Sequence, residues 1–339
     1  MNFAAYLCAI LKSFIFGSTF FFTGRLTDSA DVLDVLALRF LLSFTVLWLL
    51  KVTRVIKINV GIKTVLGRDE RSPFIKTLLL AALFEPVLYM LFETLGVAYT
   101  SGITAAVIVS LSPIATIIVE ALILRERCSG TVKALLGCGI FGAIFIAVGE
   151  GSSGGSDTVV GIIFLVASVL VGALFSSFSR KSSRHFEPME ISYVACAAGT
   201  LIFNAANVIR HLICGSITGY FDPYFNLENL IGFFFLGVMS TIVAGGMTNY
   251  AFSKLKLSVV AAFGGLSTLI TVLVGVIFDH EILYYYHYIG FAFIAVRMIG
   301  VSIVSIREEK RFGVLKPIPT APAEQATADS AAATPDGKE

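Results

Sequence analysis

Apolar runs of about twenty residues recur along the chain, and they constrain its fold more than any other feature. A helix needs roughly 20 mostly apolar residues to cross the hydrocarbon core of a bilayer. Charged residues make up only 14% of the sequence, against about 25% in a typical soluble domain. We therefore predict an all-α integral membrane protein with ten transmembrane helices. The predicted spans are residues 3–23, 33–50, 75–97, 101–124, 131–149, 158–178, 189–212, 230–252, 257–278 and 284–306.

The positions of lysine and arginine predict the orientation of these spans, because cytoplasmic loops are rich in both residues. With the N-terminus inside, the cytoplasmic loops and their flanks hold fifteen of the 25 cations, the C-terminal tail holds five, and the outer loops hold two. We therefore expect a multi-pass protein of the cell inner or plasma membrane with both termini in the cytoplasm. The basic connection at residues 51–74 is either a plain loop or an interfacial segment against anionic headgroups.

A linker rich in glycine and serine divides the spans five and five. We expect a first five-helix repeat at residues 1–149, this linker at 150–157, and a second five-helix repeat at 158–306. The remaining residues, 307–339, consist largely of alanine, proline, threonine and acidic residues. Such a composition cannot bury a core, so we expect a disordered cytoplasmic tail.

Residues at a constant offset of 155 match in two distant parts of the chain. Gly17 corresponds to Gly172, and Thr116 corresponds to Thr271. Because five is an odd number of spans, the two copies must have opposite orientations in the membrane. Inverted repeats of this kind are typical of carriers that work by alternating access.

Several short motifs resemble the EamA-type branch of the drug/metabolite transporter superfamily. They are Gly17-Ser18 at the end of the first span, residues 36–40 at the start of the second, residues 111–113 in the fourth, and Glu126 at its close. The resemblance covers residues 3–306 and implies a ten-helix carrier built from two inverted five-helix repeats. It also implies a central cavity lined by helices 1, 3, 4, 6, 8 and 9, with helices 5 and 10 at the periphery.

Three positions depart from the family pattern. Phe16 stands where a tryptophan is common, Thr268 stands where the first repeat has Pro113, and Ala195 takes the place of Arg39. The two halves are therefore chemically unequal, and most of the recognisable polar chemistry lies in the first.

Ionisable side chains inside spans are expensive and usually face a protein interior or a wet cavity. Lys12 and Glu85 lie at mid-depth, and Glu85, Tyr89 and Glu93 share one helical face. We predict that Lys12, Glu85 and Tyr89 bind the substrate. The alternative is that these charges form structural ion pairs, Lys12 with Glu85 and Arg39 with Glu93.

Either carboxylate of the third span could couple transport to protons, since desolvation pushes a carboxylate toward protonation. Glu93 is the first candidate and Glu85 the second, while the alternative for Glu93 is pairing with Arg39 as a structural ion pair. Pro86 frees the carbonyl of Ala82 and predicts a kink between the two carboxylates.

The second half offers milder candidates. Asn249 is predicted to line the cavity and bind substrate, whereas Asn204 and Asn207 are predicted to join helices. Arg297 lies deep in the last span, where we expect a structural pairing or an oligomer contact. Small residues along the fifth span, at Gly137 and Gly139, suit tight packing or the face of a homodimer.

Enzyme signatures are lacking in the sequence. The four histidines show no metal-binding spacing, and neither a nucleophile elbow nor a phosphate-binding loop is present. We expect no catalytic residues, no cofactor, no metal site and no nucleic-acid partner. The expected partners are a small-molecule substrate and the lipid bilayer.

Together these features predict a secondary active transporter that works by alternating access. Mixed charges at mid-depth favour a small polar or amphipathic metabolite, with an amino-acid-like solute preferred. Export is the tendency of the resembling family, and proton coupling depends on the carboxylates of the third span. The alternative hypothesis is a non-transporting membrane sensor or assembly component that uses the basic loop at 51–74.

Overall fold

A computed structural model gives the fold. It describes residues 3–61, 64, 71–100, 102–109, 111–119, 130–151, 159–255, 257–278 and 284–312. Glu126, Glu281 and nearly all of the predicted linker lie outside these residues. Within them the chain is helical and contains no strand.

Every predicted span contains helix. The helices are α1 (Phe3–Ser29), α2 (Val32–Val52), α4 (Ile75–Ala82), α5 (Tyr89–Ala98), α6 (Gly102–Val109), α7 (Ser112–Val119), α8 (Gly130–Gly151), α9 (Val159–Ser182), α10 (Pro188–Cys214), α11 (Leu227–Phe234), α12 (Gly245–Lys254), α13 (Leu257–Phe278) and α14 (Tyr285–Phe312). Among the described residues, six helical stretches are long and apolar enough to cross a membrane. The prediction of an all-α integral membrane protein is confirmed, and the remaining four spans stay predicted crossings.

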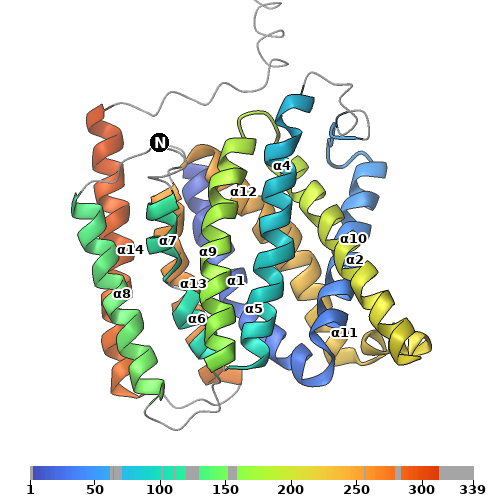
Figure 1. Ribbon diagram of the computed structural model, residues 1–339. Helices are drawn as coiled ribbons and strands as arrows, with labels where there is room; N and C mark the ends of the chain where they lie inside the picture. The colour runs from blue at the N-terminus through green and yellow to red at the C-terminus, as the bar shows by residue number, and fades with distance from the viewer. Residues whose placement is uncertain are drawn as a thin grey trace, which may run out of the picture.

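Corresponding helices of the two halves run in opposite directions. In Figure 1, α1 begins at the end of the bundle where α9 ends, and α2 begins at the end where α10 finishes. The start of α1 and the end of α14 lie together at one end of the bundle. This is the arrangement that two inverted repeats require.

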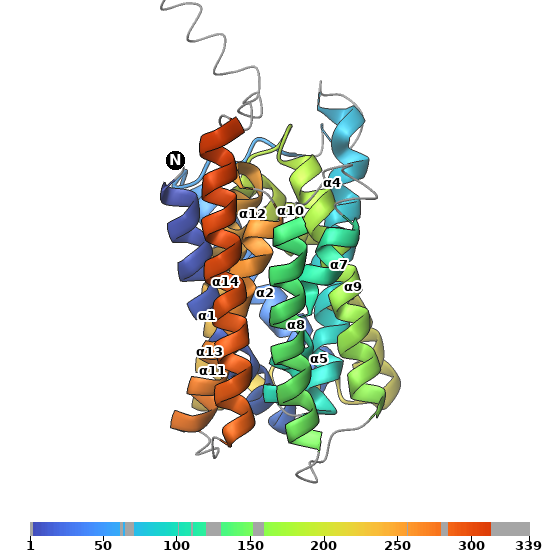
Figure 2. The same cartoon turned by 90° about the vertical axis from the view of Figure 1, so that its left-hand side faces the viewer.

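The halves interlock in the centre of the bundle. Helix α1 packs against α13, α2 against α10, and α5 against α9, so each close pair takes one helix from each half. Helices α8 and α14 pack against each other along one side, as Figure 2 shows. These two correspond to the fifth and tenth spans, which the family resemblance places at the periphery.

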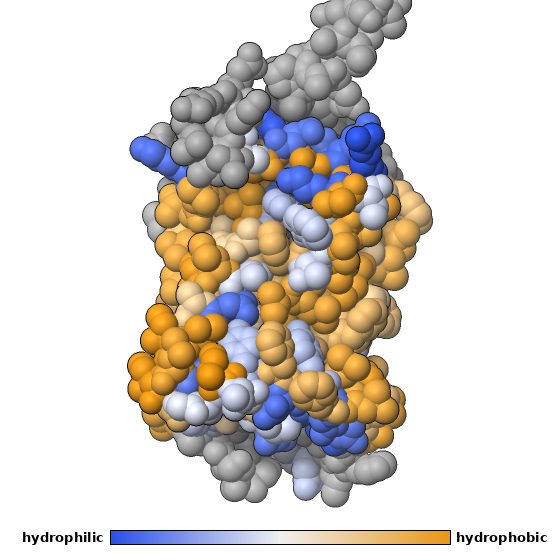
Figure 3. Space-filling model, turned by 90° about the vertical axis from the view of Figure 1, so that its right-hand side faces the viewer, coloured by the Kyte–Doolittle hydropathy of each residue, from blue (hydrophilic) through white to orange (hydrophobic). Residues whose placement is uncertain are grey.

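On the face shown in Figure 3, a broad apolar band crosses the bundle, and most hydrophilic residues gather toward its two ends. Large apolar side chains such as Leu201, Ile209 and Ile213 of α10 are exposed. Exposed apolar surface on this scale is unfavourable in water and favourable in lipid. The surface therefore agrees with a protein embedded in a bilayer.

Two long helices are interrupted by wider, π-helical turns. The first, η2 (Leu83–Leu88), joins α4 to α5 and contains Glu85 with extended backbone angles of φ −137° and ψ 124°. The kink predicted at Pro86 is confirmed. The second, η6 (Phe235–Ala244), joins α11 to α12. Adding the repeat offset of 155 to the first stretch gives residues 238–243, which fall inside the second, so both halves carry a π-helical stretch at the same place. Of the two, η2 is the one that contains a residue with non-helical backbone angles.

Candidate functional site

A cavity of about 170 Å³ lies between the two halves. Charged and aromatic side chains of the first half form one part of its wall, and hydroxyl and apolar side chains of the second half form another. The polar and charged residues of the wall are Lys12, Thr19, Arg39, Glu85, Tyr89, Glu93, Ser112, Thr116, Ser176, Ser240, Thr248 and Ser267. Helices α8 and α14 contribute no residue to this cavity among those described.

Glu85, Tyr89 and Glu93 line the cavity together, as their spacing predicted. Tyr89 and Glu93 lie one turn apart on α5, and the Tyr89 hydroxyl donates to Glu93 Oε1 at 2.6 Å. Glu85 comes from the interrupted segment, where the backbone is not helical. The shared wall therefore results from the break and the helix together rather than from one continuous helical face.

The two ion pairs predicted from depth are not formed. The Lys12 ammonium lies 5.7 Å from the centroid of the Phe16 ring. Among the described residues, no carboxylate oxygen lies within 4.0 Å of Lys12 or of Arg39. Arg39 and Glu93 are therefore not in direct contact, because α2 places the guanidinium against η6 of the other half, and the predicted pairing of Arg39 stays a prediction.

Arg39 donates instead to hydroxyl groups. Its Nε donates to Thr241 Oγ1 at 3.1 Å, and its Nη2 donates to Ser240 Oγ at 3.3 Å. Next to it, the Ser43 hydroxyl donates to the carbonyl of Gly237 at 2.8 Å. These contacts fasten α2 of the first half to the break in the second half.

Asn249 borders a smaller side pocket of about 40 Å³, which shares Glu85 and several other residues with the central cavity. Its Nδ2 donates to Ser192 Oγ at 3.0 Å, and its Oδ1 accepts from Ser179 Oγ at 2.8 Å. The amide thereby joins α9, α10 and α12. A substrate would therefore have to enter the side pocket to make the predicted contact with Asn249.

The asparagines of α10 join helices, as predicted. Asn204 donates to the carbonyl of Ala37 at 3.1 Å, and Asn207 donates to Asp34 Oδ1 at 2.9 Å. Both partners belong to α2. These bonds explain part of the close pairing between α2 and α10.

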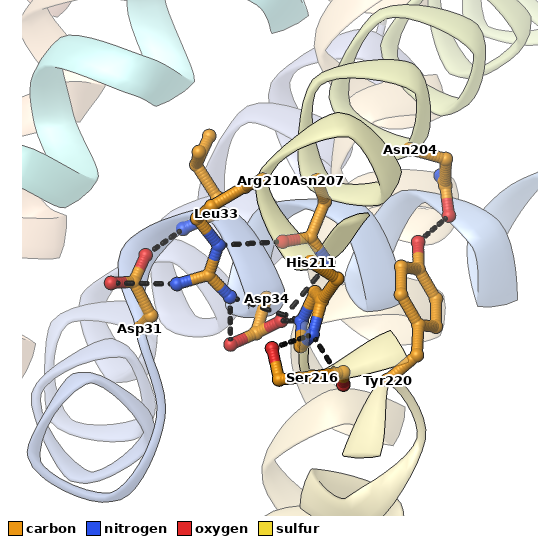
Figure 4. A network of polar contacts seen from close by, with 9 residues as sticks. All are labelled: Asp31, Leu33, Asp34, Asn204, Asn207, Arg210, His211, Ser216 and Tyr220. Carbon is orange, nitrogen blue, oxygen red and sulfur yellow. Dashed lines mark hydrogen bonds and ion pairs between the residues drawn. The ribbon is translucent and has the colours of Figure 1, made fainter. Parts of the chain in front are cut away.

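A polar network at the same helix pair was missed by the sequence reasoning (Figure 4). Asp34 accepts from Arg210 Nη2 at 2.6 Å and lies 2.8 Å from His211 Nε2. Arg210 Nη1 also lies 2.9 Å from Asp31 Oδ2. Asp34 lies at the start of one predicted span and His211 lies at the end of another. These positions could have indicated that the two side chains meet at one end of the bundle.

Arg297 is fully buried inside the chain, which excludes the predicted oligomer contact for this side chain. Its guanidinium side chain passes over Gly139 of α8 and Gly265 of α13, and a Cβ atom at either glycine would collide with it. The glycine at 139 therefore serves tight packing within the chain.

Two interlocked helical repeats around a charged central cavity define a membrane transporter. The EamA-like transporter family model matches residues 3–148 and again residues 159–305. The chain belongs to this family, and each half is one copy of its unit.

Two proteins of similar sequence are also named transporters. An uncharacterized transporter of Bacillus subtilis, YcxC, is 30% identical over 310 residues, which cover 91% of this chain and 96% of that protein. An uncharacterized transporter of Archaeoglobus fulgidus is 25% identical over 142 residues, or 40% of this chain and 48% of that one. A solved crystal structure superimposes with a TM-score of 0.67 at 15% identity, over 91% of this chain and 100% of the other, and so shares the fold.

Proposed function

We propose that this protein is a secondary active transporter of a small zwitterionic metabolite, with an amino-acid-like solute favoured. The observation that carries the proposal is the composition of the cavity wall. Two cations, Lys12 and Arg39, and two carboxylates, Glu85 and Glu93, border one cavity without forming direct ion pairs with each other. A solute with both charges would bring one anion to the cations and one cation to the carboxylates, which offsets part of the cost of keeping charges at membrane depth.

The rest of the wall limits the size and character of the solute. Phe16, Phe20, Phe175, Phe252 and Met90 give the cavity an apolar surface beside its charged one. Binding sites for small molecules commonly combine a mostly apolar lining with a few placed polar groups. An amino acid with an apolar side chain matches both surfaces.

The matching positions of η2 and η6 in the two halves support a mechanism of alternating access. Interrupted helices near the midplane of inverted repeats are where carriers bind and where their halves rock. Here η2 and η6 both contribute residues to the cavity, Glu85 from one and Ser240 from the other. We propose that bending at these breaks opens the cavity to each side in turn, with export as the working direction.

Proton coupling is proposed at Glu93, with Glu85 as the second site. A carboxylate enclosed in a low-dielectric site loses the hydration that favours its charge. The Tyr89 hydroxyl donates to Glu93 and stabilises the ionised form, so a change in that hydrogen bond would accompany any proton transfer. The start of α1 and the end of α14 lie at the same end of the bundle, which fits the proposed cytoplasmic location of both termini.

Transport by the purified protein in proteoliposomes tests this function. We expect uptake of at least one standard L-amino acid, faster with an inside-acid or inside-alkaline pH gradient than without one. Glu85→Gln should abolish most of this uptake, and the matched control Glu228→Gln, at an exposed position of α11, should not. Absence of flux for every amino acid would reject the solute class. Flux that ignores both the gradient and Glu93→Gln would reject the coupling.

A further inference from the structure

We propose that Arg39 is the receptor for the carboxylate of the transported solute, and that it releases Ser240 and Thr241 when it binds that group. This inference rests on the proposed transport of a zwitterion. It gives Arg39 a role in binding rather than in a structural ion pair.

The position of Arg39 is that of a ligand-binding side chain. It is only 2% exposed, and it lines the central cavity with Glu85, Tyr89 and Glu93. A buried cation is stabilised by an anionic partner, and a buried cation that lacks such a partner is destabilising. No described carboxylate lies within 4.0 Å of it. The cavity is therefore the side from which an anionic group can reach it.

The donors of Arg39 are only partly used. A guanidinium group carries five N–H donors, and two of them reach described hydroxyl groups at 3.1 and 3.3 Å. Hydrogen bonds from a guanidinium to a carboxylate, in which both groups are charged, are shorter, at about 2.7–2.9 Å. The bonds to Thr241 and Ser240 are thus long, neutral-acceptor bonds that a carboxylate can replace.

Arginine also suits this task better than the other cation of the cavity. The planar guanidinium fork matches a carboxylate with two parallel hydrogen bonds, whereas an ammonium acts as a point charge. Both cations lie over a neighbouring ring, Lys12 over Phe16 and Arg39 over Phe40, so the shape of the guanidinium group is what distinguishes Arg39. Arg39 therefore sets the orientation of the solute. The amino group of the solute is then directed toward the carboxylates of the third span.

Release of the two hydroxyls connects binding to movement. Ser240 and Thr241 belong to η6, the break of the second half, while Arg39 belongs to α2 of the first half. An exchange of these hydrogen bonds for a carboxylate removes two of the contacts between α2 and the break. A solute with a carboxylate would thereby loosen the segment at which the second half bends.

The test compares acids with matched amides. Proteoliposomes containing wild type, Arg39→Gln, Arg39→Lys or the exposed control Arg184→Gln are given each standard L-amino acid or its C-terminal amide, and trapped solute is quantified by mass spectrometry. We expect wild type and R184Q to prefer the acid of a transported pair. The acid-to-amide uptake ratio should fall about 10- to 100-fold in R39Q, since a charge-assisted contact is lost, and R39K should be intermediate.

Amide uptake serves as the internal control for folding. An R39Q protein that keeps amide uptake but loses the acid preference supports the receptor role. An unchanged ratio overturns it, and so does loss of both uptakes, which would indicate a structural role. If wild type transports neither member of any pair, the transport of amino acids fails together with this inference. If wild type transports both members equally, the proposed transport stands and the receptor role fails.

The release step has its own readout. Thr241→Val removes one hydroxyl that competes with the carboxylate for Arg39. The concentration of acid for half-maximal uptake should fall about 2- to 10-fold, while that of the amide should not change. A higher half-maximal concentration for the acid would contradict the release of Thr241 on binding.

Discussion

The packing of Arg297 against α8 gives a prediction with a built-in control. Two glycines lie half a turn apart on α8 and meet different surroundings. A Cβ atom on Gly139 would lie 2.8 Å from Arg297 Nε and 2.9 Å from Arg297 Cβ, with a closer collision at Cδ. A Cβ atom on Gly137 would meet nothing within 4 Å. Gly139→Ala and Gly137→Ala therefore add the same methyl group to a filled site and to an open one.

The magnitude follows from two opposing effects. Alanine favours a helix over glycine by about 1 kcal/mol, and both variants receive this gain. Overpacking a filled site costs about 1–3 kcal/mol, and only Gly139→Ala incurs that cost. The difference in unfolding free energy between the two variants should therefore be about 1–3 kcal/mol, with Gly137→Ala the more stable.

Thermal unfolding of the purified protein in detergent measures this difference. At roughly 2–4 °C per kcal/mol for a large domain, Gly139→Ala should unfold several degrees below Gly137→Ala. In an Arg297→Ala background the obstructing side chain is absent, so the two glycine substitutions should become equivalent. Equal unfolding temperatures in the wild-type background would refute the close approach of Arg297 to α8. If the two glycine variants still unfold at different temperatures in the Arg297→Ala background, the collision with Arg297 is not the cause of the difference.

Two further predictions concern the ends of the bundle. Asp34→Asn should lower the unfolding temperature, because it removes one of the two carboxylates that partner Arg210 and the one that His211 contacts; Arg210→Gln should cost less in that background than alone, as a double-mutant cycle would show. His185 stacks on Phe74 with ring centroids 3.4 Å apart, and partial burial together with the neighbouring Arg184 lowers its pKa below 6.5. Because the unfolded chain then binds more protons, stability should fall as the pH drops below about 6.5. His185→Phe should reduce that slope in a pH series of unfolding temperatures, and an unchanged slope would exclude His185 as its source.

Much of the architecture could be read from local sequence properties. Span length and the scarcity of charge predict the helices, because lipid imposes a minimum apolar length. Pro86 predicts the first break, since proline removes a backbone donor within its own segment. The offset between Gly17 and Gly172 predicts the repeat. Each of these signals lies within one span or in a direct comparison of two spans.

The second break could not be read in the same way, because no proline marks it. Inside η6 the Thr241 hydroxyl donates to the carbonyl of Leu236 at 2.7 Å, five residues earlier. Side-chain bonds to preceding carbonyls compete with the helical ladder, but threonine makes such bonds in many straight helices as well. The sequence therefore carries no distinctive sign of this second π-helical stretch.

The partners of the charged side chains were equally hidden, for a different reason. Depth in the membrane suggested that Arg39 meets Glu93, and in the structure it meets Thr241, 202 residues away. Asp34 and His211 are 177 residues apart and meet only because α2 packs on α10. Depth restricts which residues can meet but not the direction in which a helix presents them.

The unequal chemistry of the two halves has a consequence for how they would work together. Lys12, Arg39, Glu85 and Glu93 all belong to the first half, while the second half contributes hydroxyl groups such as Ser240 to the same cavity. A charged solute would therefore stay with the first half as the halves rock, and its charges would keep the same partners on both sides of the membrane. The second half would respond to occupancy through the weaker hydroxyl contacts. Since the bonds of Arg39 to η6 connect the charged half directly to the hydroxyl half, an empty and an occupied cavity would differ most at that junction.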